Sequence, residues 1–149
     1  MMLFARYLHI LGFTVWVGGM FFAYLCLRPI AAELLAAPAR LALWRGVFGK
    51  FFLWVWLAVL LLLGSGMQML ASIGKPPLFV CAMAGLGVLM MLIFGHVFFA
   101  PFARLKRAVA AQQWTAGGAA LAQIRRLIGI NLVLGLLVMS LGVLGPLLG

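Results

Sequence analysis

Four long apolar stretches constrain this chain more than any other feature of its sequence. They cover approximately residues 4–27, 51–73, 78–100 and 127–144. Each has about 20 residues, enough for a helix to cross a hydrocarbon core about 30 Å thick. Because lipid offers the backbone no hydrogen-bond partner, we expect each stretch to be helical. The sequence therefore predicts an all-α membrane protein, a single transmembrane domain over residues 1–149 that folds as an up-and-down bundle of four transmembrane helices.

The composition agrees with a lipid environment and excludes several classes of function. Hydrophobic residues make up 68% of the chain and charged residues only 8%. Glu33 is the only acidic residue and lies outside the apolar stretches. Carboxylate proton relays and carboxylate-rich metal sites therefore have no ligands within the membrane. The C-x-x-C, Walker A and G-x-S-x-G motifs are missing from the sequence, so we expect no hydrolytic or nucleotide-driven chemistry. Whether the protein is an enzyme stays open, and a non-enzymatic role is favoured.

The basic residues are concentrated in two connectors. Of the 11 Lys and Arg residues, only Arg6 and Lys75 lie outside the connectors that follow the first and third stretches. The others are Arg28, Arg40, Arg45, Lys50, Arg104, Lys106, Arg107, Arg125 and Arg126. Short cationic connectors remain in the cytoplasm under the positive-inside rule, which predicts that both termini are periplasmic. We expect these cations to contact anionic lipid of the bilayer, and we do not expect nucleic acid as a partner.

One face of the first stretch carries its most distinctive residues. His9, Trp16 and Met20 are seven and eleven residues apart, which places them on the same side of a helix. Gly12 and the pair Gly18-Gly19 lie along or near this face and allow close packing of a neighbouring helix. An ionisable residue at this depth is normally paired, bound to a metal or next to water, so a functional and a structural role both stay open for His9.

Soft metal ligands are expected at the depth of His9. If the second helix runs outwards and the third inwards, their outer halves bring sulfur atoms to this layer, which is about 10 Å thick. The predicted metal ligands near the periplasmic face are His9, Met67, Met69, Cys81 and Met83. Imidazole, thioether and thiol groups select Cu(I) over harder ions. The alternative for each methionine is that it fills a gap in the core.

His96 is the second histidine and lies near the inner end of the third stretch. Asn131 or Gln123 of the fourth helix would satisfy it with a hydrogen bond, which is a structural alternative to a cofactor role. His9 and His96 differ in depth by about 15 Å, too much for both to bind one haem iron. A haem bound by one histidine with a methionine, or with a residue of a second copy, stays open.

Short motifs in a fixed order run through all four stretches. They are His9, Trp16-Val17-Gly18-Gly19, Arg28-Pro29, Phe51-Phe52, Gly66-Met67, Met90-Met91, His96 with Phe99-Ala100-Pro101, Gln123-Ile124-Arg125-Arg126 and Asn131-Leu132-Val133-Leu134-Gly135. Together they resemble the short membrane proteins of the copper-resistance D (CopD) family. This resemblance implies a multi-pass protein of the bacterial inner membrane that binds or transports copper or confers copper resistance. It also implies that His9, with His96 and the outer methionines, handles the metal.

The resemblance implies partners and leaves two alternatives open. Longer CopD proteins have roughly double the number of helices, so a homodimer or a larger membrane complex would complete a translocation path. A periplasmic copper donor is a further implied partner. A more distant resemblance to HemJ-type protoporphyrinogen oxidases makes haem b the alternative cofactor, with His9 or His96 as the axial ligand. However, the chain lacks the lysine in the third helix and the Asn-Glu-x-Pro motif of those oxidases. The last alternative is a cofactor-free structural subunit of a membrane complex.

Overall fold

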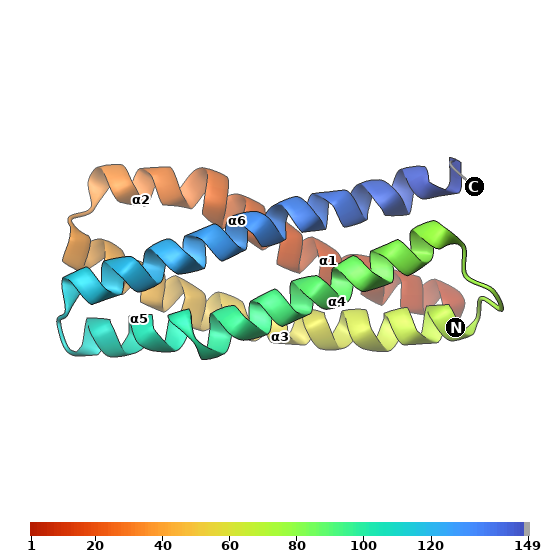
Figure 1. Cartoon of the computed structure of the whole chain (residues 1–149), viewed down its shortest axis with the longest axis horizontal. Helices are drawn as coiled ribbons and strands as arrows, with labels where there is room; N and C mark the ends of the chain where they lie inside the picture. Colours follow the sequence, from red (N-terminus) through yellow and green to blue (C-terminus); the bar gives the residue numbers. More distant parts are fainter. Residues whose placement is uncertain (148–149) are drawn as a thin grey trace.

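The computed structural model describes residues 1–147. Its regular secondary structure within that range is entirely helical, with short turns and loops between the helices. Four long rods run up and down beside one another (Figure 1). The first rod joins α1 (Met2–Phe21), the π-helical segment η1 (Phe22–Leu27) and α2 (Arg28–Leu34), and the second is α3 (Ala37–Ala71). The third rod joins α4 (Leu78–Phe99) and α5 (Pro101–Ala110). The fourth rod joins α6 (Trp114–Leu144) and the short 3-10 turn η2 (Gly145–Leu147). The predicted all-α fold with four helices long and apolar enough to cross a membrane is confirmed.

The rods are longer than the apolar stretches that predict them. Each has 33 to 35 residues, or about 50 Å of helix, against a hydrocarbon core of about 30 Å. The connectors are thus mostly helical continuations of the spans. Pro38 and Pro101 each lie in the first turn of their helix, where the missing N–H has no helical partner to lose, and Pro101 follows the break at Ala100 between α4 and α5.

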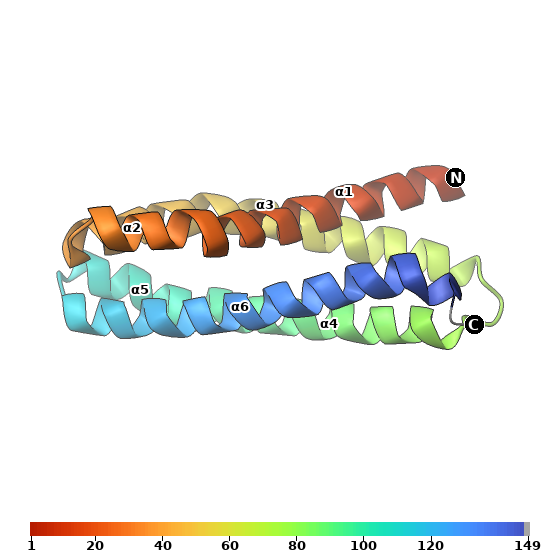
Figure 2. The same ribbon diagram turned by 90° about the horizontal axis from the view of Figure 1, so that it is seen from above.

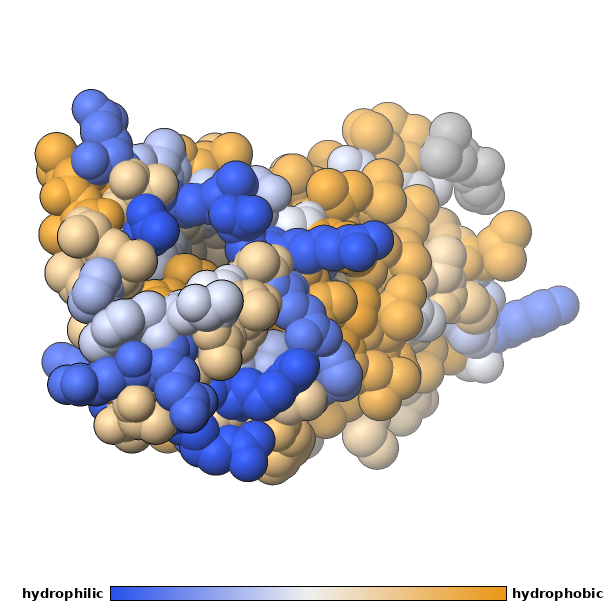
Figure 3. Space-filling view, turned by 60° about the vertical axis from the view of Figure 1, so that its left-hand side comes forward, coloured by the Kyte–Doolittle hydropathy of each residue, from blue (hydrophilic) through white to orange (hydrophobic). Residues whose placement is uncertain are grey.

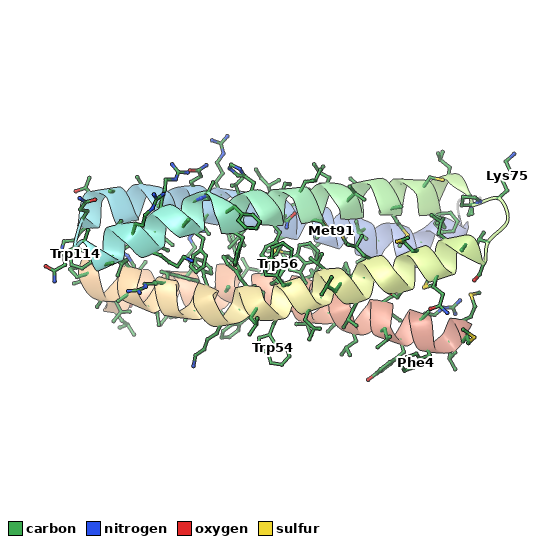
Figure 4. The ribbon with its side chains drawn as sticks, turned by 90° about the horizontal axis from the view of Figure 1, so that it is seen from below. Phe4, Trp54, Trp56, Lys75, Met91 and Trp114 are labelled. Atoms are coloured by element: carbon green, nitrogen blue, oxygen red, sulfur yellow. The ribbon has the colours of Figure 1, made fainter. Side chains whose placement is uncertain are left out.

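Most of the basic residues lie towards one end of the bundle; Arg6 and Lys75 are the exceptions. The turns at residues 35–36 and 111–113 are at this end, whereas the start of α1, the loop at residues 72–77 and η2 lie at the other (Figures 1 and 2). Lys75 and Trp114 mark the opposite ends (Figure 4). We call these the basic end and the outer end. The separation of charge along the bundle agrees with the positive-inside pattern, and the periplasmic location of the termini stays a prediction.

The rods form two helical hairpins, α1 with α3 and α4–α5 with α6 (Figure 2). Gly12 brings α1 close to α3, since a Cβ there would lie 3.1 Å from the carbonyl oxygen of Ala58. Gly19 faces the ring of Phe51 in the same way, whereas Gly18 has no neighbour within 4 Å. Close packing within the chain is therefore confirmed for Gly12 and Gly19, whereas Gly18 lies on the outer surface of the bundle, where its predicted alternative role in self-association stays a prediction.

An aromatic cluster joins the two hairpins. Phe52 of α3 lies at its centre, with ring centroids 5.5 Å from Phe94 of α4 and 5.0 Å from Phe102 of α5. Phe48 stacks on Phe52 and Trp16 of α1 meets Phe94 edge to face. These pairs have the offset or edge-to-face geometry that aromatic rings favour. The cluster fills the bundle between its middle and the basic end.

Towards the outer end, α4 packs mainly on α6. The buried residues of α4 are Met90, Phe94 and Val97, all in its second half. In its first half, Phe79 lies against Gly145 and the methyl group of Met83 lies over Gly142. In the outer half of the bundle, the side chains of α4 therefore pack on α6 and not on α3. The predicted metal ligands of α3 and α4 are arranged accordingly.

Candidate functional site

A histidine and a serine meet between α1 and α3 near the outer end. His9 is half-buried, and its Nδ1 atom lies 2.9 Å from Oγ of Ser65, whose side chain is only 5% exposed. The Ser65 hydroxyl also donates a hydrogen bond to the carbonyl oxygen of Leu61, four residues earlier on α3. Serine commonly makes this bond to its own helix when it lies in a helix interior.

These two hydrogen bonds favour one tautomer of the imidazole. A hydroxyl group has one hydrogen, and that of Ser65 is used for Leu61. The tautomer of His9 that satisfies both contacts has Nδ1–H as the donor and Ser65 Oγ as the acceptor. The proton of the neutral ring is then on Nδ1, which leaves the lone pair of Nε2 available. Metal-binding histidines have this arrangement, in which one nitrogen is held by a neighbour and the other binds the metal.

Gly66 provides the space for the ring. A Cβ at Gly66 would lie 3.4 Å from Cε1 of His9, so the imidazole packs directly against the α3 backbone. The sequence predicted a special role for His9 but did not identify Ser65 as its partner. The available signal was a lone hydroxyl between Gly64 and Gly66, at the depth of His9 on the next helix.

The structure divides the predicted sulfur ligands among different surfaces. Met69 is half-buried and lies one helical turn from Ser65, on the α3 face that meets α1. Met83 is half-buried over Gly142 of α6. Met67, 69% exposed, and Cys81 lie on the outside of the bundle. One thioether therefore shares the face of His9. Residues 1–147 contain no group of three or more His, Cys, Asp or Glu side chains that could hold a metal ion.

His96 lies apart from this site. It is exposed on α4, 18 residues after the helix begins, whereas His9 is seven residues into α1. The two imidazoles thus differ by about 17 Å along the bundle, and one haem iron cannot reach both. The expected contact of His96 with an amide does not form, because Asn131 donates to the carbonyl oxygen of Met90 and Gln123 accepts from Arg104.

Asn131 is a second polar residue inside the bundle. Its side chain is 3% exposed, and Nδ2 lies 3.3 Å from the Met90 carbonyl oxygen. Its Oδ1 atom has no hydrogen-bond partner among the described residues. Asn131 borders a cavity of about 10 Å³ between Trp16, Met20 and the aromatic cluster. This volume is about that of a single water probe, so no metal complex or haem fits there.

The fold and the site define the class: an all-helical, multi-pass membrane protein with a histidine–serine pair near one end of the bundle and, within residues 1–147, no buried carboxylate. Within that class, the chain belongs to the copper resistance protein D (CopD) family, whose profile matches residues 45–144, more than half of the chain. The predicted family is confirmed, and the protein is a membrane protein related to copper resistance. The matched residues run from α3 to α6 and do not include α1 or His9. Searches of curated proteins and of solved structures found no match.

Proposed function

We propose that the protein binds Cu(I) at the outer end of the bundle and hands it on in copper resistance. His9 binds the ion through Nε2, and Met69 provides the first sulfur ligand. The observation that carries this proposal is the pair of hydrogen bonds at Ser65, which favours the tautomer of His9 with its proton on Nδ1 and a free lone pair on Nε2. Copper is here the cargo of the protein and not a permanent cofactor.

The ligands suit a soft ion. Imidazole nitrogen and thioether sulfur favour Cu(I), and the four apolar stretches contain no carboxylate that would favour Mg²⁺, Ca²⁺ or Mn²⁺. Met83, on the other hairpin, is a third ligand if the outer halves of the hairpins approach each other. Met67 and Cys81 lie on the outside, where they serve a second copy of the chain or a periplasmic copper donor.

A single chain is better suited to binding and handing over copper than to conducting it. The aromatic cluster around Phe52 fills the bundle between His9 and the basic end. Asn131 is the only polar side chain other than Ser65 that is fully buried within residues 1–147. A path of polar groups across the membrane therefore requires a second copy or another subunit.

Copper content tests this proposal directly. The protein is expressed with copper and haem precursors, purified, and measured by elemental analysis and absorption spectroscopy. We expect stoichiometric copper that is lost in His9→Ala and retained in His96→Ala, the matched control on α4. Copper K-edge absorption should show both nitrogen and sulfur ligands, with the sulfur signal lowered in Met69→Leu. A Soret band that disappears in His9→Ala would instead establish haem b, and equal copper in His9→Ala and wild type would refute the proposed ligand.

A further inference from the structure

A large cavity opens at the basic end, away from the proposed copper site. Its volume is about 570 Å³, within the range of about 300–1,000 Å³ that is usual for small-molecule pockets. The wall is formed by η1 and α2 on one side, α6 on the other, and the first turns of α3. Figure 3 shows this end of the molecule, where hydrophilic side chains gather around a hollow. The lining residues include no histidine, methionine or cysteine.

Three arginines from three elements line this cavity. They are Arg28 of α2, Arg40 of α3 and Arg125 of α6. The guanidinium group of Arg28 is held over the ring of Tyr24, 4.9 Å from its centroid. Glu33, the only acidic residue of the chain, is not part of the lining. Three cations around one space repel each other unless an anion enters, and guanidinium groups bind phosphate oxygens with two hydrogen bonds at once.

The inner part of the cavity is apolar. Leu41 and Phe48 of α3 and Ile128 of α6 are buried and line it. Trp44 and Trp114 add aromatic walls. A small inorganic anion would gain nothing from these side chains, because it has no apolar part. The combination of an arginine rim with an apolar interior suits an amphiphilic anion.

The depth of the cavity matches the surface of a bilayer. Arg125 lies 22 residues before Leu147, or about 33 Å of helix from the outer end, and Arg28 lies about 39 Å from the start of α1. With a hydrocarbon core of about 30 Å, both arginines are at the level of the lipid phosphates. Ile128, about 29 Å from the outer end, lies at the edge of the hydrocarbon.

We propose that this cavity binds one anionic phospholipid of the leaflet at the basic end. Arg28, Arg40 and Arg125 bind its phosphate, and the apolar interior contacts the start of an acyl chain. Basic pockets between membrane helices are suited to this role. The π-helical turn η1, which lines the cavity, is a type of helix irregularity that is frequent at functional sites. The proposal is independent of copper binding, because the two sites share no residue.

Lipid binding to the purified, delipidated protein tests this proposal. Phosphatidylglycerol, phosphatidylcholine and inorganic phosphate are titrated separately, and bound lipid is counted by native mass spectrometry. We expect wild type to bind phosphatidylglycerol in preference to the other two. Arg40→Gln and Arg125→Gln should each weaken this binding about tenfold. The controls Arg45→Gln and Arg126→Gln lie on the same helices, remove the same charge and are outside the lining, so they should leave binding almost unchanged.

A second pair of variants tests the cavity itself. Gly118 lies on the cavity face of α6, and a Cβ there has no neighbour within 4 Å, so Gly118→Leu fills space without a clash. It should abolish lipid binding, whereas Gly46→Leu, at an equally open glycine outside the lining, should not. The proposal would be overturned if Arg45→Gln lost as much binding as Arg40→Gln, or if Gly118→Leu bound lipid normally. It would also be overturned if phosphatidylcholine or inorganic phosphate bound as well as phosphatidylglycerol.

Discussion

At the scale of single residues, a hydroxyl group determines what His9 can do. Ser65 has one proton to donate and gives it to Leu61, so it can only accept from the imidazole. Gly66 beside it leaves room for the ring. The histidine is therefore oriented by α3, although it belongs to α1, and Nε2 is the nitrogen that the proposed copper site uses.

Replacing Ser65 should weaken copper binding without unfolding the protein. In Ser65→Ala the Nδ1–H group loses its acceptor and the ring can turn, and loss of such supporting contacts typically lowers metal affinity about 10- to 100-fold. Ser65→Thr keeps the hydroxyl and should restore most of the affinity. Copper affinity is measured by competition with a Cu(I) chelator. Ser72→Ala, which removes an exposed hydroxyl bonded to Gln68 at the end of the same helix, is the control. Equal affinities in Ser65→Ala and Ser72→Ala would show that Ser65 does not orient the ligand.

At the scale of elements, the contact between α1 and α3 carries the site. Gly12 lies on the same face of α1 as His9, where it allows the α3 backbone to approach. Close packing at small residues is a main source of helix association in membranes, because lipid provides no hydrophobic driving force between helices. The geometry of the histidine–serine pair thus depends on a glycine that contains no functional group.

A side chain at Gly12 should separate the two helices. In Gly12→Leu the new Cβ would lie 3.1 Å from the Ala58 carbonyl oxygen, which is backbone and can only move with α3. We expect the free energy of unfolding to fall by about 2 kcal/mol, the usual cost of overpacking, and copper binding to weaken as His9 leaves Ser65. Thermal unfolding in detergent measures the first effect. Gly18→Leu, on the open side of the same helix, should change neither quantity; a similar loss there would mean that leucine harms α1 itself.

At the scale of the whole molecule, charge is sorted along the axis. The cations of the two helical connectors surround the basic end, while Lys75 is at the outer end (Figure 4) and Arg6 lies in the second turn of α1, at the same end. This asymmetry predicts which compartment each site faces: the proposed copper ligands face the periplasm and the proposed phospholipid cavity faces the cytoplasm. The two proposed sites therefore serve opposite sides of the membrane.

Labelling in intact cells tests this orientation. In a background where Cys26 and Cys81 are replaced by serine, a single cysteine is introduced at Lys75 or at Ala111, exposed positions at opposite ends. We expect a membrane-impermeant maleimide to label Lys75→Cys in intact cells and Ala111→Cys only after permeabilisation. The reverse pattern would place the termini and His9 on the cytoplasmic side, and the copper would then be bound from the cytoplasm.

Much of the architecture follows from local properties that can be read along the chain. A stretch of about 20 apolar residues in lipid must satisfy its own backbone, so the four helices and their order need no knowledge of distant contacts. The distribution of cations along the chain predicts the direction in which each helix runs along the bundle axis. The depths of His9 and His96 followed from counting residues, and the face shared by His9, Trp16 and Met20 followed from helical periodicity.

Only the tertiary structure decided which faces meet. Met69 and Met67 are two residues apart, yet one lies on the α1 side of α3 and the other on the outside. The pairing of His9 with Ser65 spans 56 residues. The arginine-lined cavity is formed by elements that are far apart in the sequence, namely η1 and α2, the first turns of α3, and α6. Such lateral contacts depend on how side chains of different helices interlock. Helical periodicity fixes angles within one helix, but it leaves the rotation of each helix about its axis to packing with its neighbours.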